Sequence, residues 1–136
     1  MRRLLAALAA LLLLTGCSQV LGTADWNQVK VDFQAGSTEG QQGNYTLLVT
    51  PTEAVYTLDG KSTSHELPQG AWDALTAGIR TLGERTSEPC PGGQFLSLEA
   101  RAGEAVKHTY QASSCDAGNA LAQAQALLEQ LIGQLR

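Results

Sequence analysis

The sequence has few positively charged side chains, few aromatic rings and only two histidines. Lys and Arg number 9 against 13 Asp and Glu in 136 residues, giving a formal net charge of −4 at pH 7. Nucleic-acid binding relies on clustered Lys and Arg that neutralise phosphates, and no such cluster occurs. We therefore expect no nucleic-acid partner.

Metal-binding and redox motifs are also missing. Neither His65 nor His108 stands in an HxH or HExxH pattern, and no CxxC pair occurs. Metal sites need several convergent ligands, so we expect no metal or other cofactor, and we expect both histidines to be solvated.

Catalytic signatures are equally scarce. No serine lies in a GxSxG turn, and the glycine-rich stretch 36–44 lacks the Lys-Ser/Thr ending of a phosphate-binding loop. We expect that stretch to be an exposed, mobile loop. Glu84 and Glu88 flank Arg85 in what we expect to be an exposed loop as well. A protein without enzymatic activity is therefore predicted, with an unrecognised hydrolase as the alternative.

The N-terminal residues have the order of a secretory signal. Arg2 and Arg3 precede an unbroken Leu/Ala run, residues 4–14, which ends at Thr15 and Gly16. A bilayer-spanning helix needs about 20 residues, so this run is too short to remain as a membrane helix. We expect residues 1–16 to be a signal peptide that is removed.

The segment Leu14-Thr15-Gly16-Cys17 resembles the lipobox of bacterial prolipoproteins. The resemblance implies that Cys17 carries a diacylglyceryl thioether and that the new amino terminus is acylated, with chains such as palmitate. Several acyl chains anchor a protein stably to a membrane. Ser18, where an Asp would favour inner-membrane retention, implies the outer membrane if the cell has one. The alternative is an ordinary signal peptide followed by an unmodified cysteine.

The cysteine count suggests one disulfide. Lipidation of Cys17 leaves Cys90 and Cys115 in an oxidising compartment, where we expect them to pair. The exported part is long enough for one domain. We expect residues 17–27 to be a lipidated tether and residues 28–136 to form a single domain.

Within that domain the hydrophobic period changes along the chain. Alternating apolar residues predict strands near 28–33, 45–49, 54–58, 94–100 and 105–111. Spacings of three and four predict two helices, one after Pro68 that ends at Gly83 and one over 121–135 that Asp116 could cap. The Leu-rich stripe of the second is expected to pack on the core. The order βββ-α-ββ-α predicts an α+β fold, a small antiparallel sheet with both helices on one face.

This order of elements, with a helix entry at Leu67-Pro68 and a Leu-rich closing helix, resembles the small emfourin-type inhibitors of thermolysin-like proteases. The lipobox resemblance implies a lipoprotein of the bacterial cell envelope, on the outer side of the cytoplasmic membrane or in the outer membrane facing the periplasm. We expect a non-catalytic binding or interaction module, held to the membrane through the lipid on Cys17, with an envelope protein as one candidate partner. The alternatives are a protease inhibitor and a structural envelope protein.

Overall fold

The computed structural model describes residues 26–37 and 43–135. The predicted signal peptide, the predicted lipid attachment site Cys17 and most of the predicted tether lie outside these ranges, as does the centre of the glycine-rich stretch. No helix within the described ranges is long and apolar enough to cross a membrane.

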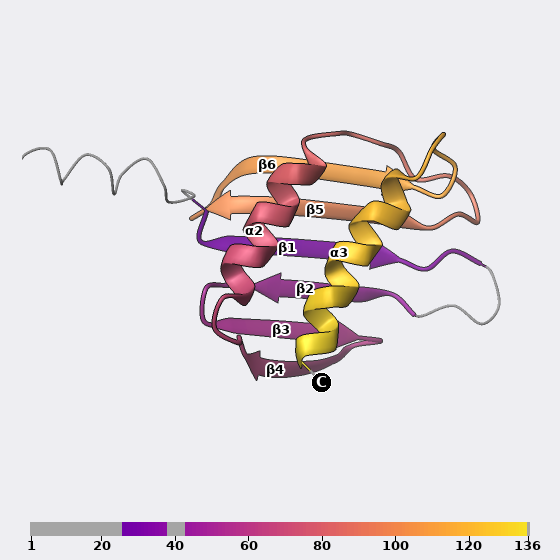
Figure 1. The fold of residues 1–136 in the computed structure, drawn as a ribbon. Coiled ribbons are helices and arrows are strands. Elements are labelled where there is room, and N and C mark those ends of the chain that lie inside the picture. The colour runs from indigo at the N-terminus through magenta and orange to yellow at the C-terminus, as the bar shows by residue number, and fades with distance from the viewer. Residues whose placement is uncertain (1–25, 38–42, 136) are drawn as a thin grey trace, which may run out of the picture.

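The fold is a six-stranded antiparallel sheet with two helices across one face (Figure 1). This confirms the predicted α+β class, with both helices on one side and one disulfide. The strand order is β4-β3-β2-β1-β5-β6. The elements are β1 (Gln28–Gln34), β2 (Tyr45–Val49), β3 (Glu53–Leu58), β4 (Lys61–Glu66), α2 (Ala71–Leu82), β5 (Phe95–Ala102), β6 (Ala105–Ser113) and α3 (Ala120–Leu135).

Strand β4 was not predicted, so four strands precede α2 and not three. Its six residues, KSTSHE, are all polar, and they lack apolar alternation because the strand lies at the sheet edge. Asp59 and Gly60 form the turn that leads into it, with φ of 49° and 81°. Asp-Gly with positive φ at both positions is a strong hairpin signal. His65 lies in this strand, where it pairs with Ala54 of β3.

The core lies between the sheet and the helices, where alternate strand residues are fully buried. Val31 of β1 stands between Leu47 of β2 and Leu98 of β5, and these three side chains have no exposed surface. Val29 lies in the same way between Val49 and Ala100. The intervening residues, such as Lys30, are half-buried on the opposite face of the sheet. The hydrophobic alternation in the sequence thus matches the side that the helices cover.

Helix α2 packs closely on α3. Leu75 and Ile79 are buried, and Gly83 ends the helix with φ of 77°, as predicted. A side chain at Gly78 would collide with Leu127 of α3. The lack of a Cβ at this glycine is what lets the two helices approach.

Helix α3 buries its apolar stripe on the sheet, as predicted. Leu121, Ala124, Leu128 and Leu131 are buried. At the start of the helix, the Tyr110 hydroxyl donates a 2.8 Å hydrogen bond to the carbonyl of Ala120.

The disulfide joins Cys90, before β5, to Cys115, after β6, with the two Cα atoms 6.4 Å apart. The predicted pairing is therefore confirmed. The segment that precedes Cys90 was expected to be an exposed loop, and for Arg85 this was wrong. Arg85 forms a short parallel bridge with β6, in which its N–H donates to Thr109 and its carbonyl accepts from Gln111.

Asp116 does not act as predicted at the start of α3, which begins four residues later. Its carboxylate accepts hydrogen bonds from the backbone N–H of Ser113 at 2.7 Å and from the Ser87 hydroxyl, and it pairs with Arg85 at 3.1 Å. These contacts, in that order of strength, lower the pKa of Asp116. The carboxylate therefore attaches the segment before Cys90 to the end of β6.

Candidate functional site

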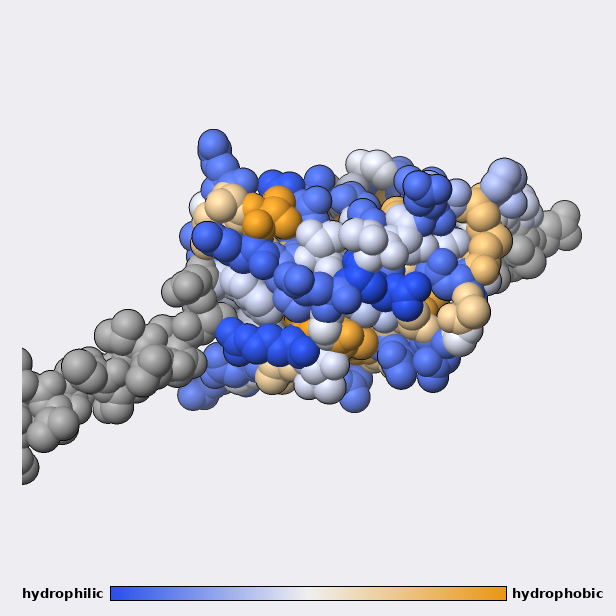
Figure 2. All heavy atoms as spheres, turned by 90° about the horizontal axis from the view of Figure 1, so that it is seen from above, coloured by the Kyte–Doolittle hydropathy of each residue, from blue (hydrophilic) through white to orange (hydrophobic). Residues whose placement is uncertain are grey.

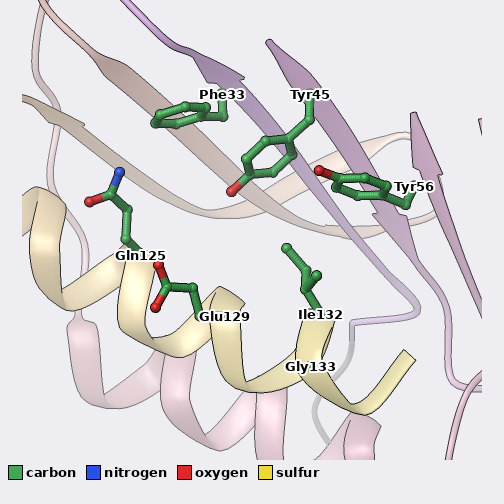
Figure 3. A pocket seen from close by; sticks show the side chains of 7 residues that line it. All are labelled: Phe33, Tyr45, Tyr56, Gln125, Glu129, Ile132 and Gly133. Carbon is green, nitrogen blue, oxygen red and sulfur yellow. The ribbon is translucent and has the colours of Figure 1, made fainter. Parts of the chain in front are cut away.

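A pocket with a volume of about 250 Å³ opens between α3 and strands β1 to β3 (Figure 3). Three aromatic side chains come from the sheet, and the remaining residues come from one side of α3. The lining consists of Phe33, Tyr45, Tyr56, Gln125, Glu129, Ile132 and Gly133.

Strand pairing brings the three rings together. Phe33 and Tyr45 are direct partners across β1 and β2, and Tyr56 pairs with Leu47, two residues along from Tyr45. The ring centroids of Phe33 and Tyr45 are 5.1 Å apart at 25°, and those of Tyr45 and Tyr56 are 5.4 Å apart at 38°. These separations are typical of favourable aromatic pairs. The rings form a continuous row on the helix-covered face of the sheet.

Helix periodicity places the other four residues opposite the rings. Gln125, Glu129 and Gly133 are four residues apart and Ile132 is three after Glu129, so they share one side of α3. Figure 3 shows Glu129 on the helix across the pocket from the row of rings, with its carboxylate lying along α3 on the side of Gln125. Glu129 is exposed at the rim, whereas Tyr45 is only 7% exposed.

Gly133 keeps part of the pocket open. A Cβ added at this position would meet no atom within 4 Å, so neither packing nor backbone strain requires a glycine. Glycine inside a helix costs about 1 kcal/mol relative to alanine. The contrast with Gly78 is direct, because only Gly78 faces a neighbouring helix.

Burial raises the pKa of Tyr45 to about 12, with smaller contributions from Tyr56 and Glu129. The phenol is therefore neutral near pH 7. The ion pairs of the described residues join Lys30 with Asp32, Arg85 with Asp116, Arg101 with Glu99, and His108 with Glu84. None of them includes Glu129, so no described basic residue neutralises its carboxylate.

The sequence did not predict this site. The tyrosines and tryptophans are scattered along the sequence, so no local pattern groups Tyr45 with Tyr56. Alternation does place Phe33 and Tyr45 on core-facing positions. What the sequence lacked was the register that makes these two residues direct neighbours. Cys90 and Cys115 do not line the pocket, and Cys17 lies outside the described residues.

A second cluster surrounds Trp26, where the described chain enters the domain. The Arg80 guanidinium carbon lies 4.9 Å from the Trp26 ring centroid, and the His108 ring lies 5.2 Å from it at 58°. His108 Nε2 is 2.8 Å from the carbonyl oxygen of Gly83, and its side chain is 10% exposed. The prediction of a solvated His108 was therefore wrong. These contacts fix the entry of the chain to α2 and β6.

Ser87 and Asp116 form the most hydrolase-like pair of the described residues, but their environment favours a structural role. The Ser87 hydroxyl lies 2.8 and 2.9 Å from the two Asp116 carboxylate oxygens, with no histidine between them. A carboxylate with a lowered pKa is a weak general base. The arrangement holds two segments together and is poorly suited to activating a nucleophile.

Within the described ranges, no group of three or more His, Cys, Asp or Glu is placed to hold a metal ion. Comparisons with protein-family models, with curated proteins and with solved structures found no match.

Proposed function

We propose that this chain is a lipid-anchored, non-catalytic binding module of a bacterial cell envelope, with the pocket beside α3 as its ligand site. The observation that carries the binding role is the pocket itself. It combines three aromatic rings with a carboxylate, Glu129, that pairs with no described basic residue. Pockets with an aromatic lining and a few polar groups are typical ligand sites.

The chemistry of the lining supports binding without catalysis. Its polar groups are two phenols, one amide and one carboxylate, with no serine, cysteine, lysine or histidine among them. A nucleophile held by a general base is the usual signature of covalent catalysis. The lining offers recognition groups and lacks such a pair.

The surface outside the pocket favours a small ligand, and not a protein with a broad interface, as the binding partner. Figure 2 shows a largely hydrophilic face on which apolar residues form small, separate groups. Among the described large hydrophobic residues, only Val106 is exposed, at 46%. Protein-docking surfaces are expected to show larger contiguous apolar patches.

The anchoring role rests on the lipobox-like segment that ends at Cys17, together with the position of the pocket. Trp26 packs at one end of the domain, and Phe33 lies near the other end of β1 (Figure 1). Strands rise about 3.3 Å per residue, so five residues from Gln28 to Phe33 span roughly 17 Å. A tether that joins the domain at Trp26 would leave the pocket accessible.

Metabolic labelling tests the anchor. Cells that express the wild-type chain should incorporate labelled palmitate into it, and the protein should fractionate with membranes. Cys17→Ser should lose the label, whereas the control Ser18→Ala should keep it. Equal labelling of the wild type and Cys17→Ser would overturn the lipid assignment.

Inhibition of a thermolysin-like protease is the alternative proposal, supported only by the order of elements. An activity assay with thermolysin and purified full-length protein tests it separately. Stoichiometric inhibition that survives Glu129→Gln and Gly133→Leu would favour the inhibitor over the pocket as the basis of function.

A further inference from the structure

We propose that the pocket beside α3 binds an alkylated ammonium group, of the kind carried by trimethylammonium metabolites and lipid head groups. The inference rests on the proposed binding function and specifies its ligand class. Three aromatic rings stand together across the pocket from a carboxylate, which is the arrangement that recognises such cations.

The aromatic row provides the first part of the recognition. Cations are attracted to ring faces within about 6 Å of the centroid, and the effect grows when the site is desolvated. Neighbouring centroids in the row are 5.1 and 5.4 Å apart, so one ligand group can contact more than one ring. The low exposure of Tyr45 shows that the inner end of the pocket is shielded from solvent.

The Glu129 carboxylate provides the charge. It lines the same pocket as the rings, from the α3 side (Figure 3), and it is absent from every ion pair formed by the described residues. The whole chain is also acidic, with a formal net charge of −4. An anionic ligand would face this carboxylate without a described basic residue to receive it.

The size of the pocket restricts the ligand to a small group. Pockets for drug-sized ligands have volumes of about 300–1,000 Å³, and this pocket has about 250 Å³. Gly133 contributes open space, and Ile132 contributes an apolar wall that methyl groups can contact. The cavity suits a head group better than an extended molecule.

Alkylation of the nitrogen is favoured by the composition of the lining. A primary ammonium carries three N–H donors, each of which needs an acceptor once water is removed. Four of the seven lining residues, Phe33, Tyr45, Tyr56 and Ile132, have an aromatic or aliphatic side chain, and Glu129 is the only charged one. A methylated nitrogen carries fewer donors and places methyl groups against the rings.

The test is an NMR titration of full-length protein in maltoside micelles, which lack an ammonium head group. Tetramethylammonium chloride should shift the signals of Tyr45, Tyr56 and Gly133 in a saturable way, and sodium chloride at equal ionic strength should not. Neopentyl alcohol, a neutral analogue of similar shape, should bind at least about tenfold more weakly if cation–π and charge interactions contribute together.

Two variants locate the site. Glu129→Gln should weaken tetramethylammonium binding about threefold to tenfold, since the carboxylate is at the rim. The control Glu104→Gln removes the same charge from the exposed β5–β6 turn and should leave binding unchanged. Gly133→Leu should fill the pocket and abolish the saturable shifts, while far-ultraviolet circular dichroism confirms that the variant is folded.

The outcomes separate the two proposals. Equal binding of neopentyl alcohol and tetramethylammonium would overturn the cation assignment and leave the pocket as a binding site. If neither probe shifted the pocket signals, both proposals would fail. Titrations with choline and with a short-chain phosphatidylcholine below its micelle concentration then identify the source of the ammonium group. A site for a free metabolite should bind only choline. A site for a lipid head group should bind both.

Discussion

At the scale of single residues, Tyr45 connects the stability of the fold with the properties of the pocket. Its ring is 7% exposed and stacks on Phe33 within the core cluster, while the same residue lines the cavity opposite Glu129. Burial raises its pKa to about 12 from an ordinary value of 10.0. The folded protein therefore holds the phenol in its neutral form more strongly than the unfolded chain does.

This pKa difference predicts a loss of stability at alkaline pH. Below pH 10 the phenol is neutral in both states, so its contribution is fully present, and it falls as pH rises from 10 to about 12. Tyr45→Phe should lose less stability than the wild type across this window. Urea unfolding at a series of pH values measures the difference. Parallel curves for the wild type and Tyr45→Phe would contradict the assignment.

Asp116 predicts the opposite dependence at acid pH. Its pKa is lowered from 3.8 in the folded state, so its contribution is present above that value and is lost as pH falls through the folded pKa. Asp116→Asn should be less stable than the wild type at pH 7, and the difference should shrink at low pH. Denaturant midpoints test this, with Glu88→Gln in the same segment as the control. A stability difference that did not change with pH would argue against the network around Asp116.

At the scale of elements, the sequence predicted the parts with strong hydrophobic periods and missed those that depend on pairing. The apolar stripe on α3 and the alternation in β1 were sufficient to predict these two elements, because burial of one face imposes those patterns on the sequence. Strand β4 carries no apolar side chain, and only the Asp59-Gly60 turn before it pointed to a hairpin. The pocket depends on register between strands and on a helix that crosses them. Neither is encoded in a local pattern.

The contact between α2 and α3 predicts different effects of alanine at two helical glycines. Gly78→Ala should be less stable than Gly133→Ala, because the Leu127 side chain must move to admit the new Cβ and this offsets the helix-propensity gain of up to about 1 kcal/mol. Gly133→Ala should stabilise it by up to about 1 kcal/mol because its Cβ would meet no neighbour. Chemical denaturation of both variants tests the pair. Equal effects at the two positions would contradict the helix packing.

The disulfide between the segment before β5 and the loop after β6 predicts a large contribution to stability. It closes a loop over a sequence separation of 25, which on the chain-entropy model stabilises by about 3.5 kcal/mol. The double variant Cys90→Ala/Cys115→Ala should lose stability of that order. Reduction should lower the wild type to the level of the variant and leave the variant unchanged. A wild type with the same stability before and after reduction would exclude a structural role for the bond.

At the scale of the whole molecule, the chain entry and the pocket lie toward opposite ends of the sheet. Trp26 is held by Arg80 and His108 at one end, whereas Phe33 and Tyr45 open onto the cavity at the other. This arrangement suits a domain that is tethered to a membrane through its N-terminus and binds a ligand with its far end. The membrane-tethered part of that description depends on the chain being attached at Cys17.

Intact-protein mass spectrometry of the chain purified from the membranes of its native host tests this attachment most directly. We predict a mature protein that begins at Cys17 and carries a diacylglyceryl thioether and an acylated amino terminus. A chain that still begins at Met1, or one with an unmodified thiol at Cys17, would contradict the proposed anchoring.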